Sequence, residues 1–206
     1  PTLGMLTKFL TEIDIDLPQV DTVLLTHMHP DHSNGLSDVN GKRLFPNAEI
    51  VVSEKDIDYW HDDSAMAKAN ENQRVRYFEG ARFQIAPYMD RLKPAMGEVF
   101  PNVRAVDLSG HTPGHTGYMI ESQNDSLLVW GDICHVPDIQ VRRPEVTMVF
   151  DADPEAAINT RRRTFDMVSS DKVLVAGMHL HFPGFSHVIA NRDGYRMVPE
   201  SWAFTT

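Results

Sequence analysis

The chain has 206 residues, enough for one large domain with a hydrophobic core and too few for two domains of ordinary size. It is 42% hydrophobic, and it contains no apolar run near the roughly 20 residues needed to cross a membrane. Its 19 basic and 29 acidic residues give a net charge of −10, which argues against a nucleic-acid-binding surface. The single cysteine, Cys134, precludes an internal disulfide and leaves the cellular compartment undecided.

Helices and strands alternate in the first half of the sequence. Apolar residues at helical spacing predict an opening helix that ends at Leu17-Pro18. The periodic residues are Leu3, Leu6, Leu10 and Ile13. Short β-branched runs predict strands at 22–26 and 47–53, and the second strand leads into a helix through Tyr59-Trp60. The stretch 64–92 favours two helices, and a loop is predicted after it at Pro94, Gly97 and Pro101.

The second half also mixes the two kinds of element. It contains a predicted strand at 103–108 and a predicted antiparallel pair at 117–121 and 127–130. Asp153-Pro154-Glu155 is a strong helix start, with a carboxylate cap followed by proline, and the helix runs to about Val168. The last predicted strands lie at 172–176, around Val188 and at 195–198. This intermixing indicates a layered α/β domain.

The densest group of potential ligands follows the first predicted strand. Three histidines and one aspartate fall within six positions: His27, His29, Asp31 and His32. Neutral imidazole nitrogens together with a carboxylate oxygen suit borderline divalent metal ions. One loop cannot complete even a four-coordinate shell, so the remaining ligands are expected from later in the chain.

Three later strands end in candidate ligands as well. These are His115, in the run Gly110-His111-Thr112-Pro113-Gly114-His115, then Asp132, and then His179. A lone histidine is usually structural, but ligand-type residues at the ends of four strands indicate one metal centre. His111 is expected to hydrogen-bond within its own loop, and Cys134 to be a small buried residue.

This order of motifs resembles the metallo-β-lactamase superfamily, from Thr22 over nearly the whole chain. The late run 176–187 is similar to methyl parathion hydrolase-like enzymes and related lactonases. Gly131-Asp132, Pro144-Glu145-Val146 and 194–199 share that similarity. The resemblance implies a four-layer αβ/βα sandwich with a dinuclear site at the sheet edges. The family's opening strands are not found before Pro1, so a single, N-terminally truncated domain over 1–206 is expected, with a helical insertion at about 54–100.

The resemblance also implies a ligand set. One metal ion would be held by His27, His29 and His115, and the other by Asp31, His32 and His179, with Asp132 between them. Zinc is predicted from the ligand types, although manganese, cobalt or iron would fit the same donors. Two such cations activate a shared water for hydrolysis, and Asp31 and Asp132 are the predicted catalytic carboxylates.

The predicted substrates are small, neutral and hydrophobic: lactones or aryl esters first, organophosphate triesters second. The candidate pocket residues are Trp60, Phe78, His181, Phe182 and Phe185. No nucleic-acid or membrane partner is expected, and the resembling enzymes suggest a homodimer. The run 161–163 of three arginines sits in a predicted helix, and two of the three should face water.

Three alternatives remain open at this stage. The same superfamily also hydrolyses β-lactams and glutathione thioesters, although no basic cluster for a glutathione carboxylate is evident. A di-iron redox module is disfavoured because that branch carries glutamate where this chain has His29. A non-enzymatic scaffold is disfavoured because every ligand position of the family is filled.

Overall fold

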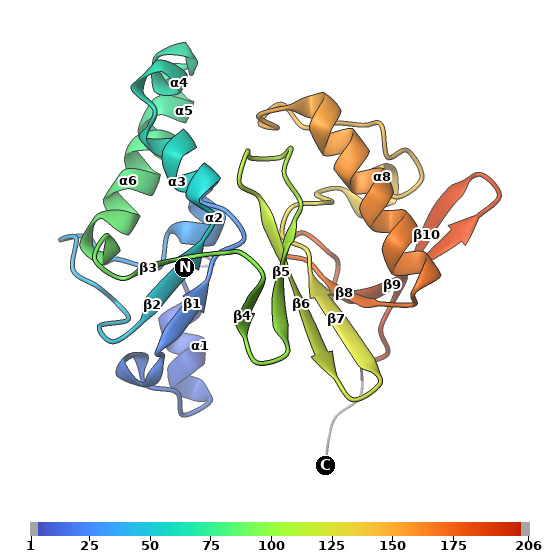
Figure 1. Ribbon diagram of the computed structural model, residues 1–206, viewed down its shortest axis with the longest axis horizontal. Helices are drawn as coiled ribbons and strands as arrows, with labels where there is room; N and C mark the ends of the chain where they lie inside the picture. The colour runs from blue at the N-terminus through green and yellow to red at the C-terminus, as the bar shows by residue number, and fades with distance from the viewer. Residues whose placement is uncertain (1–3, 203–206) are drawn as a thin grey trace. The chain divides into compact units, whose positions relative to one another are not determined.

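A computed structural model describes residues 4–202, and the chain divides into two compact units, Pro1–Ala95 and Met96–Thr206. Each unit has its own sheet (Figure 1), and each has its own hydrophobic core. The grouping of both units into one domain over residues 1–206 stays a prediction. None of the helices in the described residues is long and apolar enough to cross a bilayer.

The first unit is built on a parallel sheet, which within the described residues has three strands in the order β1-β2-β3. The strands are β1 (Thr22–Leu24), β2 (Glu49–Val52) and β3 (Leu92–Pro94). Parallel neighbours need crossover connections, and helical segments supply most of the chain between β2 and β3. The helical segments of this unit are α1 (Leu6–Glu12), η1 (Leu17–Gln19), α2 (Pro30–Ser33), α3 (Glu54–His61), α4 (Asp63–Lys68), α5 (Glu71–Gln73), the π-helical η2 (Arg74–Glu79), α6 (Gly80–Ile85) and η3 (Ala86–Tyr88).

The core of the first unit joins its sheet to these helices. Ile50 on β2 packs in one cluster with Trp60 of α3, Phe78 of η2 and Tyr88 of η3, and each of these side chains is buried. The Tyr88 hydroxyl donates to the Leu36 carbonyl at 2.8 Å and accepts the Phe45 N–H at 3.1 Å. Tyr88 therefore combines apolar burial with two hydrogen bonds to the loop between β1 and β2.

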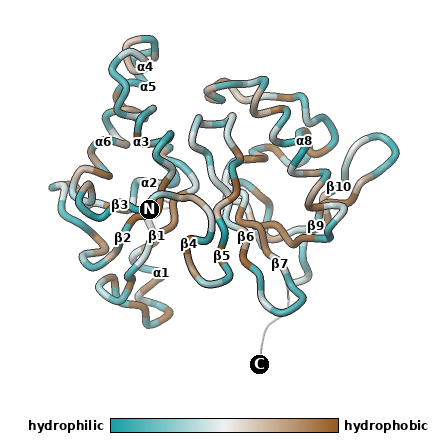
Figure 2. Tube along the Cα trace, in the orientation of Figure 1, coloured by the Kyte–Doolittle hydropathy of each residue, from teal (hydrophilic) through white to brown (hydrophobic). Residues whose placement is uncertain are grey.

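The second unit contains a larger mixed sheet, seven-stranded over the described part of the chain, in the order β10-β9-β8-β7-β6-β5-β4. The strands are β4 (Glu98–Phe100), β5 (Val103–Asp107), β6 (Thr116–Ser122), β7 (Asp125–Val129), β8 (Leu174–Ala176), β9 (Phe185–Asn191) and β10 (Gly194–Pro199). Neighbours are antiparallel except β7 and β8, which run parallel and are connected through α7 (Pro137–Gln140) and α8 (Pro154–Ser170). Figure 2 shows hydrophobic residues concentrated along the central strands of this sheet.

Most elements lie where the sequence predicted them. The stretch 64–92 holds two helical runs as expected, 63–68 and 71–88, and the Asn70 side chain begins the second run by accepting the Gln73 N–H. The predicted loop is correct at Gly97 and Pro101, which lie between strands, and wrong at Pro94, which belongs to β3. Pro94 is compatible with β3 because it ends a strand at the edge of the sheet. Leu3, part of the predicted first helix, lies outside the described residues.

Candidate metal centre

The ligand-rich loop of the first unit begins directly after β1. His29 is the residue just before the short helix α2, and Pro30 occupies the first position of the helix, where a missing N–H costs nothing. The turn brings the His32 ring to within 4.1 Å of the His27 ring, measured between centroids, and the His27 and His29 rings are 4.9 Å apart. The Asp31 carboxylate lies 3.5 Å from His32 Nε2. One tight turn therefore gathers three imidazoles and a carboxylate.

A buried carboxylate stabilises the backbone of this loop. Asp56 on α3 is 0% exposed, and its Oδ2 accepts the Met28 N–H at 2.8 Å and the Trp60 indole N–H at 3.0 Å. Met28 lies between His27 and His29, so Asp56 fixes the backbone from which both rings project. The His29 ring also contacts the rings of Trp60, at 5.1 Å, and Tyr77, at 5.0 Å. Asp56 belongs to no sequence motif, so its role could not be predicted from the sequence.

The second unit gathers imidazoles around one buried carboxylate, that of Asp132. Asp132 follows β7, and its side chain is 3% exposed. Its Oδ2 lies 3.2 Å from His111 Nε2 and 3.0 Å from His135 Nε2, whereas Oδ1 lies 3.4 Å from His179 Nε2. The two oxygens of one carboxylate thus face different imidazoles, as expected of a carboxylate that bridges two cations.

The structure places His115 differently from its predicted role. His115 Nδ1 donates to the Leu108 carbonyl at 2.9 Å, and Nε2 accepts the Asp132 N–H at 2.9 Å. Both ring nitrogens therefore contact backbone groups, which disagrees with the prediction that His115 is a metal ligand. His111, expected to bond only within its loop, instead presents Nε2 to the Asp132 carboxylate. Sequence spacing could not choose between two histidines four positions apart.

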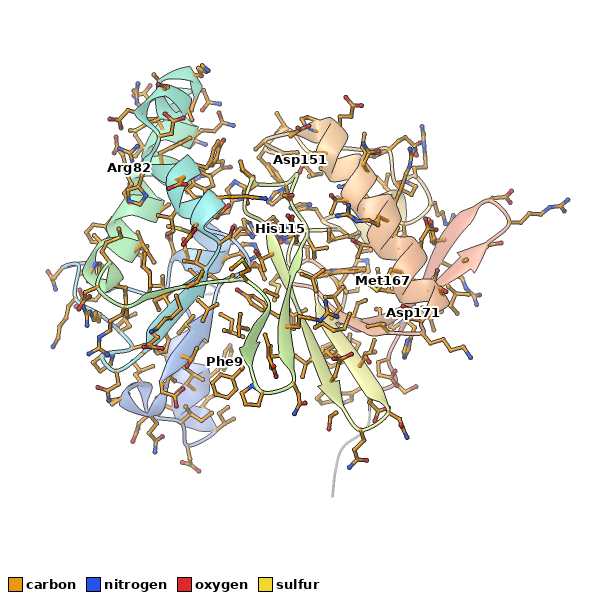
Figure 3. All side chains as sticks on the ribbon, viewed as in Figure 1. Phe9, Arg82, His115, Asp151, Met167 and Asp171 are labelled. Atoms are coloured by element: carbon orange, nitrogen blue, oxygen red, sulfur yellow. The ribbon has the colours of Figure 1, made fainter. Side chains whose placement is uncertain are left out.

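His111 is held from its other side by a second buried carboxylate. Asp151 Oδ1 lies 2.8 Å from His111 Nδ1, and Asp151 Oδ2 accepts the Met148 N–H at 2.7 Å. Burial on its own would lower the pKa of His111, but the carboxylates of Asp132 and Asp151 outweigh it and raise that pKa. Burial would raise the pKa of Asp151, but hydrogen bonds from His111 and Met148 lower it, so this carboxylate stays ionised. Figure 3 labels Asp151 and His115 in this unit.

Two further buried side chains brace the loops around Asp132. Gln140 accepts the His135 N–H at 2.7 Å and donates to the Val146 carbonyl at 3.0 Å. Arg161 on α8 is 1% exposed and donates to three carbonyls, those of Ile133, Pro144 and Val146, at 2.7 to 2.9 Å. The prediction that two of the three consecutive arginines face water is confirmed, because the other two are exposed.

The predicted pocket residues fall into two groups. Trp60 and Phe78 are 1% and 3% exposed and belong to the core of the first unit, which is a packing role rather than a pocket-lining one. Phe182 and Phe185 are 73% and 40% exposed on the second unit. His181 bonds to Asp138 at 3.0 Å. It also lines a cavity of about 300 Å³ together with Val141, Arg142, Tyr195, Arg196 and Met197.

The donors in each unit fit divalent metal ions by their chemistry. The first unit offers His27, His29, Asp31 and His32, and the second offers His111, Asp132 and His179. Imidazole nitrogens and carboxylate oxygens are the ligands expected for zinc and neighbouring transition metals. Asp132 and His179 follow the parallel strands β7 and β8, whose carboxyl ends meet at one edge of the sheet, a usual location for α/β sites.

Comparison with known proteins also indicates a family of metal-dependent enzymes. The model of the metallo-beta-lactamase superfamily matches residues 2–179. The N-acyl homoserine lactonase of Bacillus thuringiensis is 24% identical over 180 residues, which cover 86% of this chain. This chain spans 60% of the length of that curated relative.

Solved structures agree closely in fold. The hydrolase AbOPH of the beta lactamase superfamily shares a TM-score of 0.90 and 33% identity, over 99% of this chain and 72% of that one. AidC, a dizinc quorum-quenching lactonase, shares a TM-score of 0.89 and 25% identity, over 98% and 71% of the two chains. These matches confirm the fold class predicted from the sequence.

Proposed function

Because the chain belongs to the metallo-beta-lactamase superfamily, we propose that it is a dinuclear metal-dependent hydrolase of hydrophobic lactones. The observation that carries the proposal is the Asp132 carboxylate, whose Oδ2 faces His111 and whose Oδ1 faces His179. A carboxylate buried between imidazoles on both of its oxygens is suited to bridging two cations. The similarity to lactonases of Bacillus thuringiensis and to AidC supports the choice of reaction.

The proposed ligand set revises one residue of the set predicted from the sequence. His27, His29 and His111 would hold one ion, and Asp31, His32 and His179 would hold the other, with Asp132 available to both. His111 replaces His115, because the His115 nitrogens contact backbone groups. Zinc is the first choice of metal from the ligand types and from the dizinc relative AidC, and manganese, cobalt or iron suit the same donors.

Asp31 and Asp132 are assigned different roles because their side chains differ in solvent exposure. When bound, two divalent cations supply Lewis acidity and activate water for attack on an ester carbonyl. The Asp132 side chain is 3% exposed, so its carboxylate is suited to a fixed role as a ligand. Asp31, at 57%, can exchange a proton with solvent and return it to the leaving alkoxide of an opened lactone. Asp31 is therefore assigned the proton transfer and Asp132 the bridge.

The substrate assignment ranks lactones above aryl esters and above phosphotriesters. The named activity of the Bacillus thuringiensis relative is hydrolysis of N-acyl homoserine lactones, which carry an apolar acyl chain and a neutral ring. Exposed aromatic side chains such as Phe182 and Phe185 offer apolar contact area near the His179 loop. A ligand set that activates water does not itself choose between carbonyl and phosphoryl centres, so the substrate panel must separate them.

The test combines metal content with a substrate panel on the full chain. Elemental analysis after zinc loading is expected to give two ions per chain, and acyl homoserine lactones are expected to turn over faster than an aryl acetate or a paraoxon-type triester. Nitrocefin and S-lactoylglutathione test the β-lactam and thioester alternatives in the same assay. Removal of metal by chelation should abolish turnover, and added zinc should restore it. Two bound ions with no turnover of any lactone would overturn the proposal.

A further inference from the structure

We infer that Asp151 is a positioning residue for the proposed metal centre, which fixes the His111 ring so that Nε2 faces Asp132. The inference rests on the proposed function, since it assigns a task to His111 as a ligand. Asp151 lies 40 positions after His111 and belongs to none of the motifs recognised in the sequence. It is not proposed to contact substrate or metal.

The geometry specifies where the proton of His111 must sit. The Asp151 Oδ1 lies 2.8 Å from Nδ1, and an ionised carboxylate can only accept, so Nδ1 carries the hydrogen. The neutral ring that would bind a metal ion then has its lone pair on Nε2, the nitrogen that lies 3.2 Å from the Asp132 Oδ2. A histidine binds metal through a lone pair, and a carboxylate on the opposite nitrogen both selects this tautomer and raises the basicity of the ligand atom.

Both oxygens of Asp151 are in use, which explains why this position requires a carboxylate. Oδ1 accepts from His111, and Oδ2 accepts the Met148 N–H at 2.7 Å. Asparagine offers one acceptor oxygen, so its NH2 group would have to face either the Met148 N–H or the His111 Nδ1–H. Alanine would remove the acceptor of both the His111 Nδ1–H and the Met148 N–H.

Backbone contacts hold the Asp151 loop against the His111 loop. The Ala152 N–H donates to the His111 carbonyl at 2.9 Å, and the Asp153 N–H donates to the Gly110 carbonyl at 3.0 Å. Gly110 permits this approach: a Cβ there would lie 2.4 Å from the Ala157 backbone nitrogen, and its φ of +138° is one that side-chain-bearing residues rarely adopt. The carboxylate therefore reaches His111 from a fixed frame, as positioning requires.

The test compares Asp151→Ala and Asp151→Asn with Asp153→Ala in the full chain. Asp153 is a matched control because it lies two residues away and its side chain caps α8 by accepting the Ala156 N–H. Zinc affinities are measured by competition with a chromogenic chelator. Asp151→Ala is expected to weaken one of the two zinc affinities about 10- to 100-fold, and Asp151→Asn to weaken it less. Asp153→Ala is expected to lower the melting temperature and leave both affinities unchanged.

A second readout follows the ring itself. Long-range proton–nitrogen correlation spectra of the zinc-free chain are expected to show a proton on Nδ1 of His111 in the wild type and in Asp153→Ala. In Asp151→Asn the spectra should show loss or redistribution of that proton, and this variant keeps the test available if the alanine variant does not fold.

The outcomes separate this inference from the proposed function. Two tight zinc ions in the wild type and in both Asp151 variants, with an unchanged Nδ1 proton, overturn the inference and leave the proposed function standing. A wild-type chain that binds no zinc overturns the proposed function and the inference with it. An equal loss of affinity in Asp153→Ala also overturns the inference, because it shows that any weakening of this loop has the same effect.

Discussion

The two units hold their potential ligands in different ways. In the first unit the proposed ligands are His27, His29, Asp31 and His32, which are neighbours in the chain, so covalent geometry and the short helix α2 set most of their relative positions. In the second unit the proposed ligands come from three separate loops. In the second unit, side-chain contacts therefore have to fix the relative positions that chain connectivity fixes in the first unit.

The supporting residues reflect this difference. Asp56 in the first unit bonds to backbone, at the Met28 N–H, and to the Trp60 indole in the core. Asp151 in the second unit bonds to the ring of His111 itself. When the ligands are adjacent in the chain, fixing the backbone conformation positions all of them. When they come from separate loops, each imidazole ring has to be oriented by its own contacts. We therefore expect loss of Asp56 to lower stability first, and loss of Asp151 to weaken metal binding first.

The largest predicted effect distinguishes the two histidines of the Gly110–His115 turn. His111→Ala is expected to lose one of two bound zinc ions and at least about 100-fold of lactone turnover, because second-shell changes alone cost 10- to 100-fold. His115→Ala removes an acceptor for the Asp132 N–H and a donor to the Leu108 carbonyl, so it should lower stability and keep two zinc ions. Metal analysis and urea denaturation of both variants measure the contrast.

The opposite pattern would restore the assignment made from sequence. If His115→Ala loses an ion while His111→Ala keeps both, His115 is the ligand and the second unit must rearrange when metal binds. His61→Ala is a suitable control, since His61 is exposed on α3 and bonds to the Ile57 carbonyl. It should leave metal content and turnover unchanged.

The same contrast explains how far the sequence could predict this site. Ligand-type residues after short apolar strands are visible in sequence, because strand ends and histidine spacing are local features. The choice of His111 over His115 depends on which backbone groups each ring meets, which only the folded loops decide. Asp56 and Asp151 were missed for the same reason, since each acts on a residue distant in the chain.

The helices and strands also differ in whether neighbouring residues or distant contacts determine them. The helix starting at Asp153 was predictable because its cap and Pro154 are adjacent in sequence. Two helices in 64–92 were predicted correctly, but the position of the break between them was not, because it depends on the cap at Asn70, which competes with continuation of the helix. Strand β3 was missed because its assignment depends on pairing with β2, as at Leu92 and Ile50, rather than on its own residues.

The next prediction tests the first unit. Asp56→Ala leaves the buried N–H groups of Met28 and Trp60 without this acceptor, at about 1–3 kcal/mol each in free energy of unfolding. Asp58→Ala is the matched control, two positions along α3 and exposed, with an expected change within about 0.5 kcal/mol. Urea denaturation of the zinc-free chain measures both. If Asp56→Ala weakens zinc binding as strongly as Asp151→Ala and leaves stability unchanged, the proposed contrast between the units is wrong.

The smallest predicted effect compares one tyrosine from each unit. Tyr88→Phe removes a donor to the Leu36 carbonyl and an acceptor for the Phe45 N–H, both buried, and should cost about 1–3 kcal/mol of unfolding free energy. Tyr195→Phe removes one exposed hydrogen bond to Asp166 and should cost at most about 1 kcal/mol at neutral pH. Equal costs, measured by urea denaturation, would show that burial does not decide the effect.

Alkaline pH sharpens this last comparison. Burial and the hydrogen bond to Asp166 raise the pKa of Tyr195 to about 12, above its ordinary value of 10.0. A raised folded-state pKa means that the stabilising contribution is complete below about pH 10 and is lost as the pH rises towards 12. Tyr195→Phe lacks this contribution, so its stability should fall less steeply over that range than the wild type's. A wild-type phenol titration at 295 nm that shows every tyrosine ionising near pH 10 would contradict the raised pKa, because an unperturbed phenol is already half ionised there.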